Sequence, residues 1–261
     1  MLKKILLSFV LALLFSNVLF IDTSNVLIGD GGDNFEFLGF MHLAKENMLD
    51  GRSPFSHTDV LRYPHGFEYD HGADGFLTIV IGAVFNLFLG PVISYNITVV
   101  ILLFLNILSC LVFFEKIADL NEIKNNKQVK IILASVVFGF SPYIFARINS
   151  HLNLSTILGI PVLMYSMVLM NNNIVQRSQN IKREDFLLVV ISVILVGLGS
   201  LQYLILLFLV SPFLLAYIVI NNNLKSYVWF LKNYTKDIML SGLLLLLLFT
   251  MVWWGYVYAA L

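Results

Sequence analysis

Long apolar runs recur along most of this 261-residue chain, and they limit the folds that it can adopt. Hydrophobic residues make up 59% of the sequence and charged residues only 12%. A soluble domain averages about 25% charged residues, and a globule of this size could not cover so much apolar surface. We therefore expect an all-α membrane protein with several membrane-spanning helices.

The lengths of the apolar runs predict about seven transmembrane helices, since each crossing needs about 20 apolar residues. The run 186–220 would be roughly 52 Å long as one helix, so we divide it at the turn-forming segment 199–203. The predicted spans are 5–21, 92–114, 130–146, 153–170, 186–201, 203–220 and 238–258.

Charge distribution predicts the orientation. If the apolar segment 76–90 does not cross, the inner segments carry 12 of the 16 Lys and Arg residues, which is the positive-inside pattern. A crossing there would place ten of those twelve outside. We therefore predict an interfacial or re-entrant helix at 76–90 and a cytoplasmic N-terminus. Segment 5–21 favours an uncleaved signal anchor over a cleavable signal peptide, and either would export the chain that follows.

Two bulk properties exclude other classes of site. The formal net charge is zero, which gives no basis for nucleic-acid binding. Cys110 is the single cysteine, so an internal disulfide and a cysteine-based zinc site are excluded.

A polar segment, residues 22–75, interrupts the apolar pattern and forms the predicted first external loop. It holds 10 of the 16 acidic residues and four of the five histidines, but only three basic residues. Its glycine-rich start contains Asp30 and Asp33, which could bind Mg²⁺ or Mn²⁺ or supply a base. Alternatively, they only cap the turn and a helix that runs to about Leu49. That helix has an apolar stripe and could lie on the membrane surface.

Two further clusters are predicted on the same face of the membrane. Asp70 and His71 could form a base and its orienting partner or a pair of metal ligands, or belong to an ordinary polar turn. Arg147 and His151, in the loop between two spans, could hold a phosphate at headgroup depth. The alternative for this pair is interfacial anchoring.

The order of several short motifs resembles the type C glycosyltransferase (GT-C) superfamily, and more narrowly its bacterial members that use polyprenyl-phosphate-linked sugars. The resemblance extends from residue 19 to about 170, and the span pattern continues it to the end. The motifs are Gly-Asp-x-x-Asp at 29–33, Gly-x-x-Pro at 51–54, Tyr-Pro-x-Gly at 63–66, Asp70-His71, Phe-Ser-Pro-Tyr at 140–143 and Ser-His-Leu-Asn-Leu at 150–154.

The resemblance implies that residues 1–261 form one GT-C-like transmembrane module, with an external loop at 22–75 and the interfacial segment at 76–90. It also implies a C-terminal region that this sequence lacks. An acid of the first loop would be the general base or metal ligand, with Asp33 as first choice and Asp30 as second. Lipid-phosphate or substrate contacts would come from Arg147, His151, Arg62, Asp70 and His71. Oligosaccharyltransferase relatives carry Asp-x-Asp, whereas this chain has Asp-x-x-Asp, which leaves Mg²⁺ or Mn²⁺ dependence open.

The implied activity is transfer of a hexose or pentose from polyprenyl phosphate to a glycan, lipid or protein acceptor. It would occur on the extracytoplasmic face of a bacterial inner membrane, as a step of cell-envelope glycosylation. The leaving group is a stable phosphate, so the reaction needs a base for the acceptor hydroxyl and positive charge for the phosphate. The rival readings are a lipid-linked-sugar transporter or flippase and a non-catalytic membrane subunit. A transporter would place polar groups inside its spans, where Asn106 and Gln202 are the clearest candidates.

Overall fold

The structure is a computed structural model, and it describes residues 2–29, 31–59, 65–66, 74–176, 181–221 and 224–260. The described segments are helical and contain no β-strand, which confirms the predicted all-α class. The α-helices are α1 (Leu2–Phe15), α2 (Asp33–Leu49), α3 (Phe76–Asn86), α4 (Pro91–Leu120), α5 (Lys127–Gly139), α6 (Pro142–Ser150), α7 (Gly159–Val175), α8 (Arg183–Gly199), α9 (Leu201–Ile220) and α10 (Leu224–Ala260). Two 3₁₀ helices, η1 (Val18–Phe20) and η3 (Leu152–Ser155), complete the described elements.

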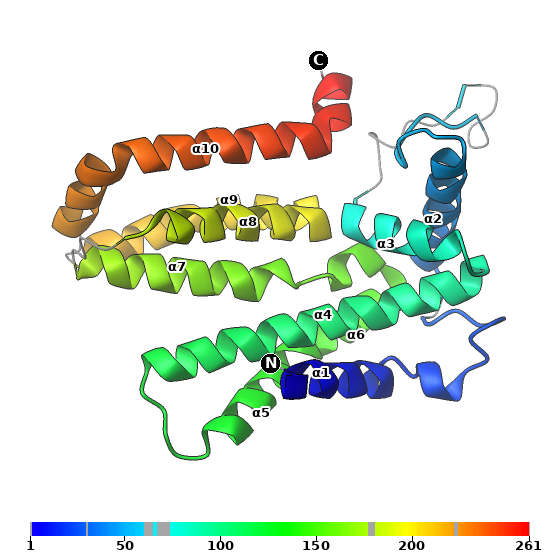
Figure 1. The fold of residues 1–261 in the computed structure, drawn as a ribbon, viewed down its shortest axis with the longest axis horizontal. Helices are drawn as coiled ribbons and strands as arrows, with labels where there is room; N and C mark the ends of the chain where they lie inside the picture. Colours follow the sequence, from blue (N-terminus) through cyan, green and yellow to red (C-terminus); the bar gives the residue numbers. More distant parts are fainter. Residues whose placement is uncertain are drawn as a thin grey trace.

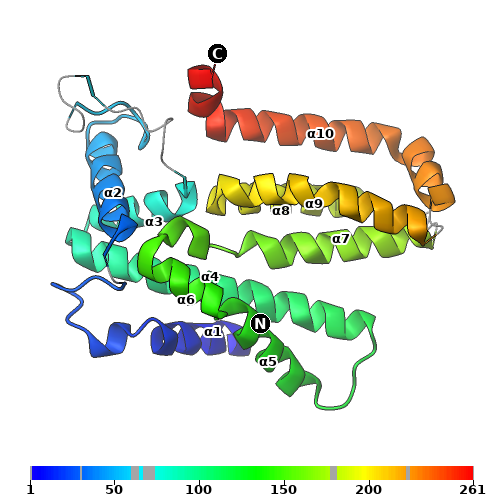
Figure 2. The ribbon, with the colours of Figure 1, turned by 180° about the vertical axis from the view of Figure 1, so that it is seen from behind.

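Most of the long helices run along the same axis, and the chain passes back and forth between two ends of the bundle (Figure 1). Helix α2 lies across one end, which we call the α2 end, close to the start of α9. The C-termini of α4 and α7 lie at the opposite end with the N-termini of α8 and α10. The reverse view shows the same arrangement (Figure 2).

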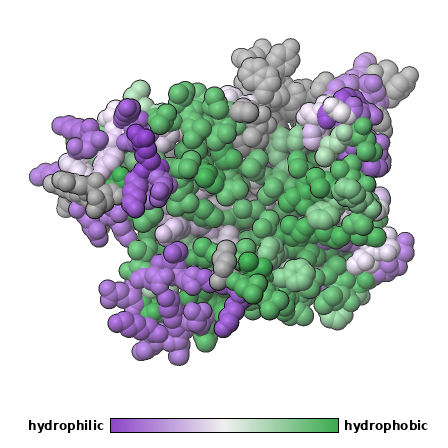
Figure 3. Space-filling model, viewed as in Figure 1, coloured by the Kyte–Doolittle hydropathy of each residue, from purple (hydrophilic) through white to green (hydrophobic). Residues whose placement is uncertain are grey.

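Among the described residues, two helical units are long and apolar enough to cross a membrane, by length and composition. They are α4 and the kinked unit Lys127–Ser150, which α5 and α6 form together. Figure 3 shows hydrophobic residues over the middle of the visible face and hydrophilic residues toward its two ends. Side chains such as Phe208 and Phe213 of α9 are exposed on the bundle surface.

Local sequence explains why several helices differ from the predicted spans. Helix α1 ends at Phe15, short of the predicted residue 21, because Asn17 adopts a left-handed conformation with φ 57°. The predicted span 130–146 is interrupted after Gly139, and Pro142 occupies the first turn of α6. Proline is favoured at that position, because the N–H that it lacks would have no acceptor in the first turn of a helix. The expected break near residue 200 is present, because Ser200 is extended between α8 and α9.

The predicted span 153–170 begins later, at Gly159, because the preceding residues form a turn that α4 holds. Asn106 of α4 is fully buried, and its Nδ2 donates to the carbonyl of Ser155 at 2.7 Å. Its Oδ1 accepts the N–H of Ile157 at 3.0 Å. Asn106 therefore satisfies backbone groups that the irregular segment leaves unpaired.

A second buried asparagine of α4 fixes the start of the external loop. Asn96 accepts the N–H of Ile28 at 2.8 Å and donates to the carbonyls of Thr23 and Val26. Asn96 is only 1% exposed, so its side-chain amide is committed to these contacts with the loop.

Helix α2 buries more of its surface in the protein than a helix resting on a membrane would. Phe37, Met41 and Leu43 lie in the main hydrophobic core, while Phe35 and Leu49 are exposed. Helix α3 packs between α2 and α4. Its 11 residues span roughly 16 Å, so it is too short to cross a bilayer, as predicted.

Candidate functional site

The structure brings together two residues that lie 118 positions apart and that the sequence singled out separately. Nδ1 of His151 lies 2.5 Å from Oδ2 of Asp33. Since a carboxylate can only accept hydrogen bonds, Nδ1 carries the proton. The side chain of His151 is 42% exposed and that of Asp33 is 47% exposed, so the pair is accessible from the surface of the protein.

Neighbouring residues hold the two elements of this pair together. Asp33 begins α2, and His151 directly follows α6. Asn34 is fully buried, and its Nδ2 donates to the carbonyl oxygens of Ile148 at 3.2 Å and Asn149 at 2.7 Å. These are C-terminal carbonyls of α6, which lack helical partners.

This arrangement corrects the reading in which Asp33 caps α2. The N-cap residue is Gly32, which has no side chain to bond the free N–H groups there. Asp33 and Asn34 instead direct their side chains to His151 and α6. Asp33 still lies in the first turn of α2, where the helix dipole favours a negative charge.

The glycine at position 29 allows this close approach. Its φ is +119°, and a Cβ atom there would overlap Nδ2 of Asn34. The same Cβ would lie 3.1 Å from each of the two carbonyl oxygens that Asn34 binds. The Gly-Asp-x-x-Asp motif is thus explained in part by packing, since Gly29 leaves room for the contact between α2 and α6.

A polar cavity of about 280 Å³ lies beside the pair. Its walls come from α2, the η3 segment, the residue before Gly75 and the start of α9. The lining residues are Asp33, Glu36, Phe37, Phe40, Asp74, His151, Asn153, Leu154 and Gln202.

Asp74 fixes the wall of the cavity opposite α2. Its Oδ1 accepts the N–H of Leu201 at 2.8 Å, and its Oδ2 accepts Nδ2 of Asn153 at 2.9 Å and the hydroxyl of Ser200. Asp74 thereby satisfies the free N–H at the start of α9 and connects α9 to the segment that follows His151. The sequence did not predict this role, and its only signal was an acid at the end of the polar segment, just before the apolar segment 76–90.

Arg147 lies one helical turn before His151 on α6. Its guanidinium carbon is 5.0 Å from the centre of the Tyr143 ring, an arrangement typical of a cation–π contact. No carboxylate within the described residues pairs with it, and its buried Nε has no hydrogen-bonding partner there. Arg147 therefore keeps donors and a positive charge available for an anion.

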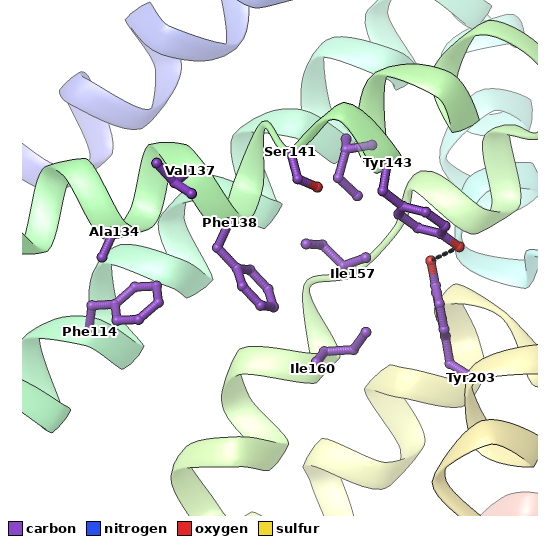
Figure 4. Close-up of a pocket in the computed structure, with 10 residues that line it drawn as sticks. Phe114, Ala134, Val137, Phe138, Ser141, Tyr143, Ile157, Ile160 and Tyr203 are labelled. Carbon is purple, nitrogen blue, oxygen red and sulfur yellow. Dashed lines mark hydrogen bonds between the residues drawn. The ribbon is translucent and has the colours of Figure 1, made fainter. Parts of the chain in front are cut away.

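An apolar cavity of about 520 Å³ lies between α4, α5, α6, the start of α7 and the start of α9. Figure 4 shows Phe138 of α5 and Ile160 of α7 pointing into it, with Tyr143 and Tyr203 at one end. The hydroxyl groups of the two tyrosines are 3.3 Å apart. The Tyr203 hydroxyl also donates to the carbonyl of Leu154, which lines the polar cavity. The two cavities are therefore neighbours.

No protein-family model, curated protein or solved structure matches the chain. The resemblance to GT-C enzymes therefore rests on the sequence motifs alone.

The remaining predicted site residues lie outside the described residues. These are Asp30, Arg62, Asp70 and His71. Within the described segments, no group of three or more His, Cys, Asp or Glu side chains could hold a metal ion. Of the two predicted Mg²⁺ or Mn²⁺ ligands, Asp33 is described and Asp30 is not, so this metal site stays a prediction.

Proposed function

We propose that this protein is an integral-membrane glycosyltransferase of the GT-C type, which moves a sugar from a polyprenyl-phosphate donor to an acceptor outside the cytoplasm. The proposal rests on the order of three side chains along α6 and directly after it. Tyr143 and Arg147, four residues apart, share one face of α6. His151 directly follows the helix, and its N–H donates to the carbonyl of Arg147.

These three residues offer an apolar surface, a cation and a polar reaction site in that order. Positions 143 and 151 are roughly 12 Å apart along a helix. A lipid tail would lie in the apolar cavity, its phosphate would bind Arg147, and its sugar would enter the polar cavity. Guanidinium groups suit phosphate oxygens because their donors match the geometry of the anion.

The proposed reaction then needs only the groups beside the polar cavity. The acceptor hydroxyl attacks the anomeric carbon and gives up its proton to the Asp33–His151 pair. The bond from that carbon to the phosphate oxygen breaks, and its electron pair leaves with the phosphate. Arg147 stabilises the negative charge on the phosphate, and direct displacement inverts the anomeric centre.

The proposal includes seven membrane crossings, formed by α1, the combined unit of α5 and α6, and the helices α4, α7, α8, α9 and α10. Under this topology the α2 end faces outward, α3 lies in the interface, and the N-terminus is cytoplasmic. The hydrophobic middle and hydrophilic ends in Figure 3 support this topology. The compartment would be the inner membrane of a bacterium.

The transporter alternative receives no support from Asn106, which was a candidate polar group inside a span. Both ends of its amide are occupied by backbone groups of the turn before α7. Gln202, the other candidate, lines the polar cavity at the α2 end.

The test is an assay of the purified protein in lipid nanodiscs with short-chain prenyl-phosphate hexoses and pentoses. Release of free prenyl phosphate reports both transfer and hydrolysis by water. We expect turnover of at least one donor, and a loss of about 10²-fold or more in Asp33→Asn. Asp50→Asn is the matched control, because Asp50 is exposed and its ion-pair partner among the described residues is Arg52. The proposal fails if no donor is consumed, or if Asp33→Asn and Asp30→Asn each keep full activity.

A further inference from the structure

We infer that His151 is the residue that takes the proton from the acceptor, and that Asp33 acts on it as a positioning residue. This inference rests on the proposed function and changes the roles that the sequence suggested for both residues. His151 was expected to contact phosphate and Asp33 to be the base.

The hydrogen bond between His151 and Asp33 determines which ring nitrogen of His151 can accept a proton. Because Nδ1 of His151 donates to Asp33, the neutral imidazole has its lone pair on Nε2, at the far edge of the ring. Nε2 has no partner within the described residues, and His151 lines the polar cavity. A histidine held in this way by a carboxylate is a common arrangement for a general base.

Backbone hydrogen bonds hold His151 in place. The N–H of His151 donates to the carbonyl of Arg147 at 2.7 Å, and its own carbonyl accepts the N–H of Leu154 at 3.0 Å. Asn34 also fixes the end of α6 on which His151 sits. The ring is thus positioned from both its backbone and its Nδ1, as a general base requires.

The charges near His151 favour its role as a base over a role in phosphate binding. If His151 became cationic, the carboxylate of Asp33 at 2.5 Å would offset its charge. Other acids that line the cavity are Glu36 and Asp74, so the cavity is an unfavourable place for a second anion. Arg147 has no such carboxylate partner within the described residues, and it is therefore the better site for the phosphate.

In the proposed step, each bond that forms is matched by one that breaks. The acceptor O–H bond breaks, its proton moves to Nε2, and the oxygen forms a bond to the anomeric carbon. The bond between that carbon and the phosphate oxygen breaks, and the phosphate keeps the electron pair. Asp33 stabilises the imidazolium that results.

The first experiment is independent of activity. In protein with ¹⁵N-labelled histidine, the signal of His151 is assigned with His151→Gln. We expect a protonated Nδ1 and an unprotonated Nε2 at neutral pH, and we expect Asp33→Ala to abolish this preference. The inference is overturned if His151 carries its proton on Nε2 or if Asp33→Ala changes nothing.

The second experiment uses the donor assay. We expect His151→Ala to lose about 10²–10⁴-fold and to recover partly when imidazole is added. Asp33→Ala should lose activity without recovery by imidazole, and the double variant should be no slower than His151→Ala, because the two residues act as a unit. His42→Ala is the control, since His42 lies on the exposed side of α2.

The two proposals fail in different ways. If His151→Ala keeps the wild-type rate while Asp33→Ala is inactive, Asp33 is the base, the inference is wrong and the proposed function stands. If the tautomer is as expected but the wild type consumes no donor, the glycosyltransferase proposal fails, and with it the assignment of the acceptor's proton to His151.

Discussion

Substitution of Gly29 by alanine tests whether the contact between α2 and α6 depends on a glycine at this position. Two costs are expected. A non-glycine residue at φ +119° is strained by about 1–3 kcal/mol. The new Cβ would also displace Nδ2 of Asn34 and break its bonds to Ile148 and Asn149. Leaving the buried contact with Ile148 unmade costs about 1–3 kcal/mol, whereas the contact with Asn149 is only partly buried.

The expected loss for Gly29→Ala is therefore about 4 kcal/mol. For a chain of this size, each kcal/mol corresponds to roughly 2–4 °C, so Tm should fall by about 8–16 °C. The assay is thermal unfolding of the purified protein in detergent, followed by intrinsic fluorescence and by retention of monomer on size exclusion.

Two further glycines separate the causes. Gly51 has φ +71° but open space around the position of a Cβ, so Gly51→Ala reports strain alone, about 1–2 kcal/mol. Gly39 lies inside α2 and also has open space, so Gly39→Ala should stabilise by about 0.5–1 kcal/mol.

A double variant completes the test. If the overlap with Asn34 causes the loss, Gly29→Ala combined with Asn34→Ala should cost clearly less than the sum of the two single changes. The reasoning is refuted if Gly29→Ala is no more destabilising than Gly51→Ala, or if the two costs simply add.

Three other predictions follow from buried contacts. Asn106→Leu should lower Tm by about 4–24 °C, because it leaves two buried backbone groups of the turn before α7 unpaired, at about 1–3 kcal/mol each; an unchanged Tm would contradict this role. Asn96→Leu should release the turn at 22–28, and amide hydrogen exchange should then increase there by at least tenfold while exchange in α10 stays constant. Gly159→Ala should lower Tm because a Cβ would overlap the backbone of α8, whereas Gly242→Ala has open space and should leave Tm unchanged; equal effects of the two changes would contradict this account of packing.

The amino-acid sequence by itself determined the helical class. Long apolar runs favour helices, because each backbone group can bond within its own helix. The break before Pro142 was not predicted. The Gly199-Ser200 break is a local signal, so the change of direction there could be predicted. The ends of α1 and α7 could not, because Asn17 adopts a rare conformation and the start of α7 depends on a side chain 50 residues earlier.

The tertiary structure alone decided which polar residues form the site. Asp33 and His151 were both candidates, but their direct contact joins segments 118 residues apart, and no local pattern encodes such a pairing. The same holds for Asp74, whose partners at the start of α9 are more than 120 residues away. Helix propensity and hydropathy act over a few turns of chain, whereas the meeting of these side chains depends on how α2, α6 and α9 pack at one end of the bundle.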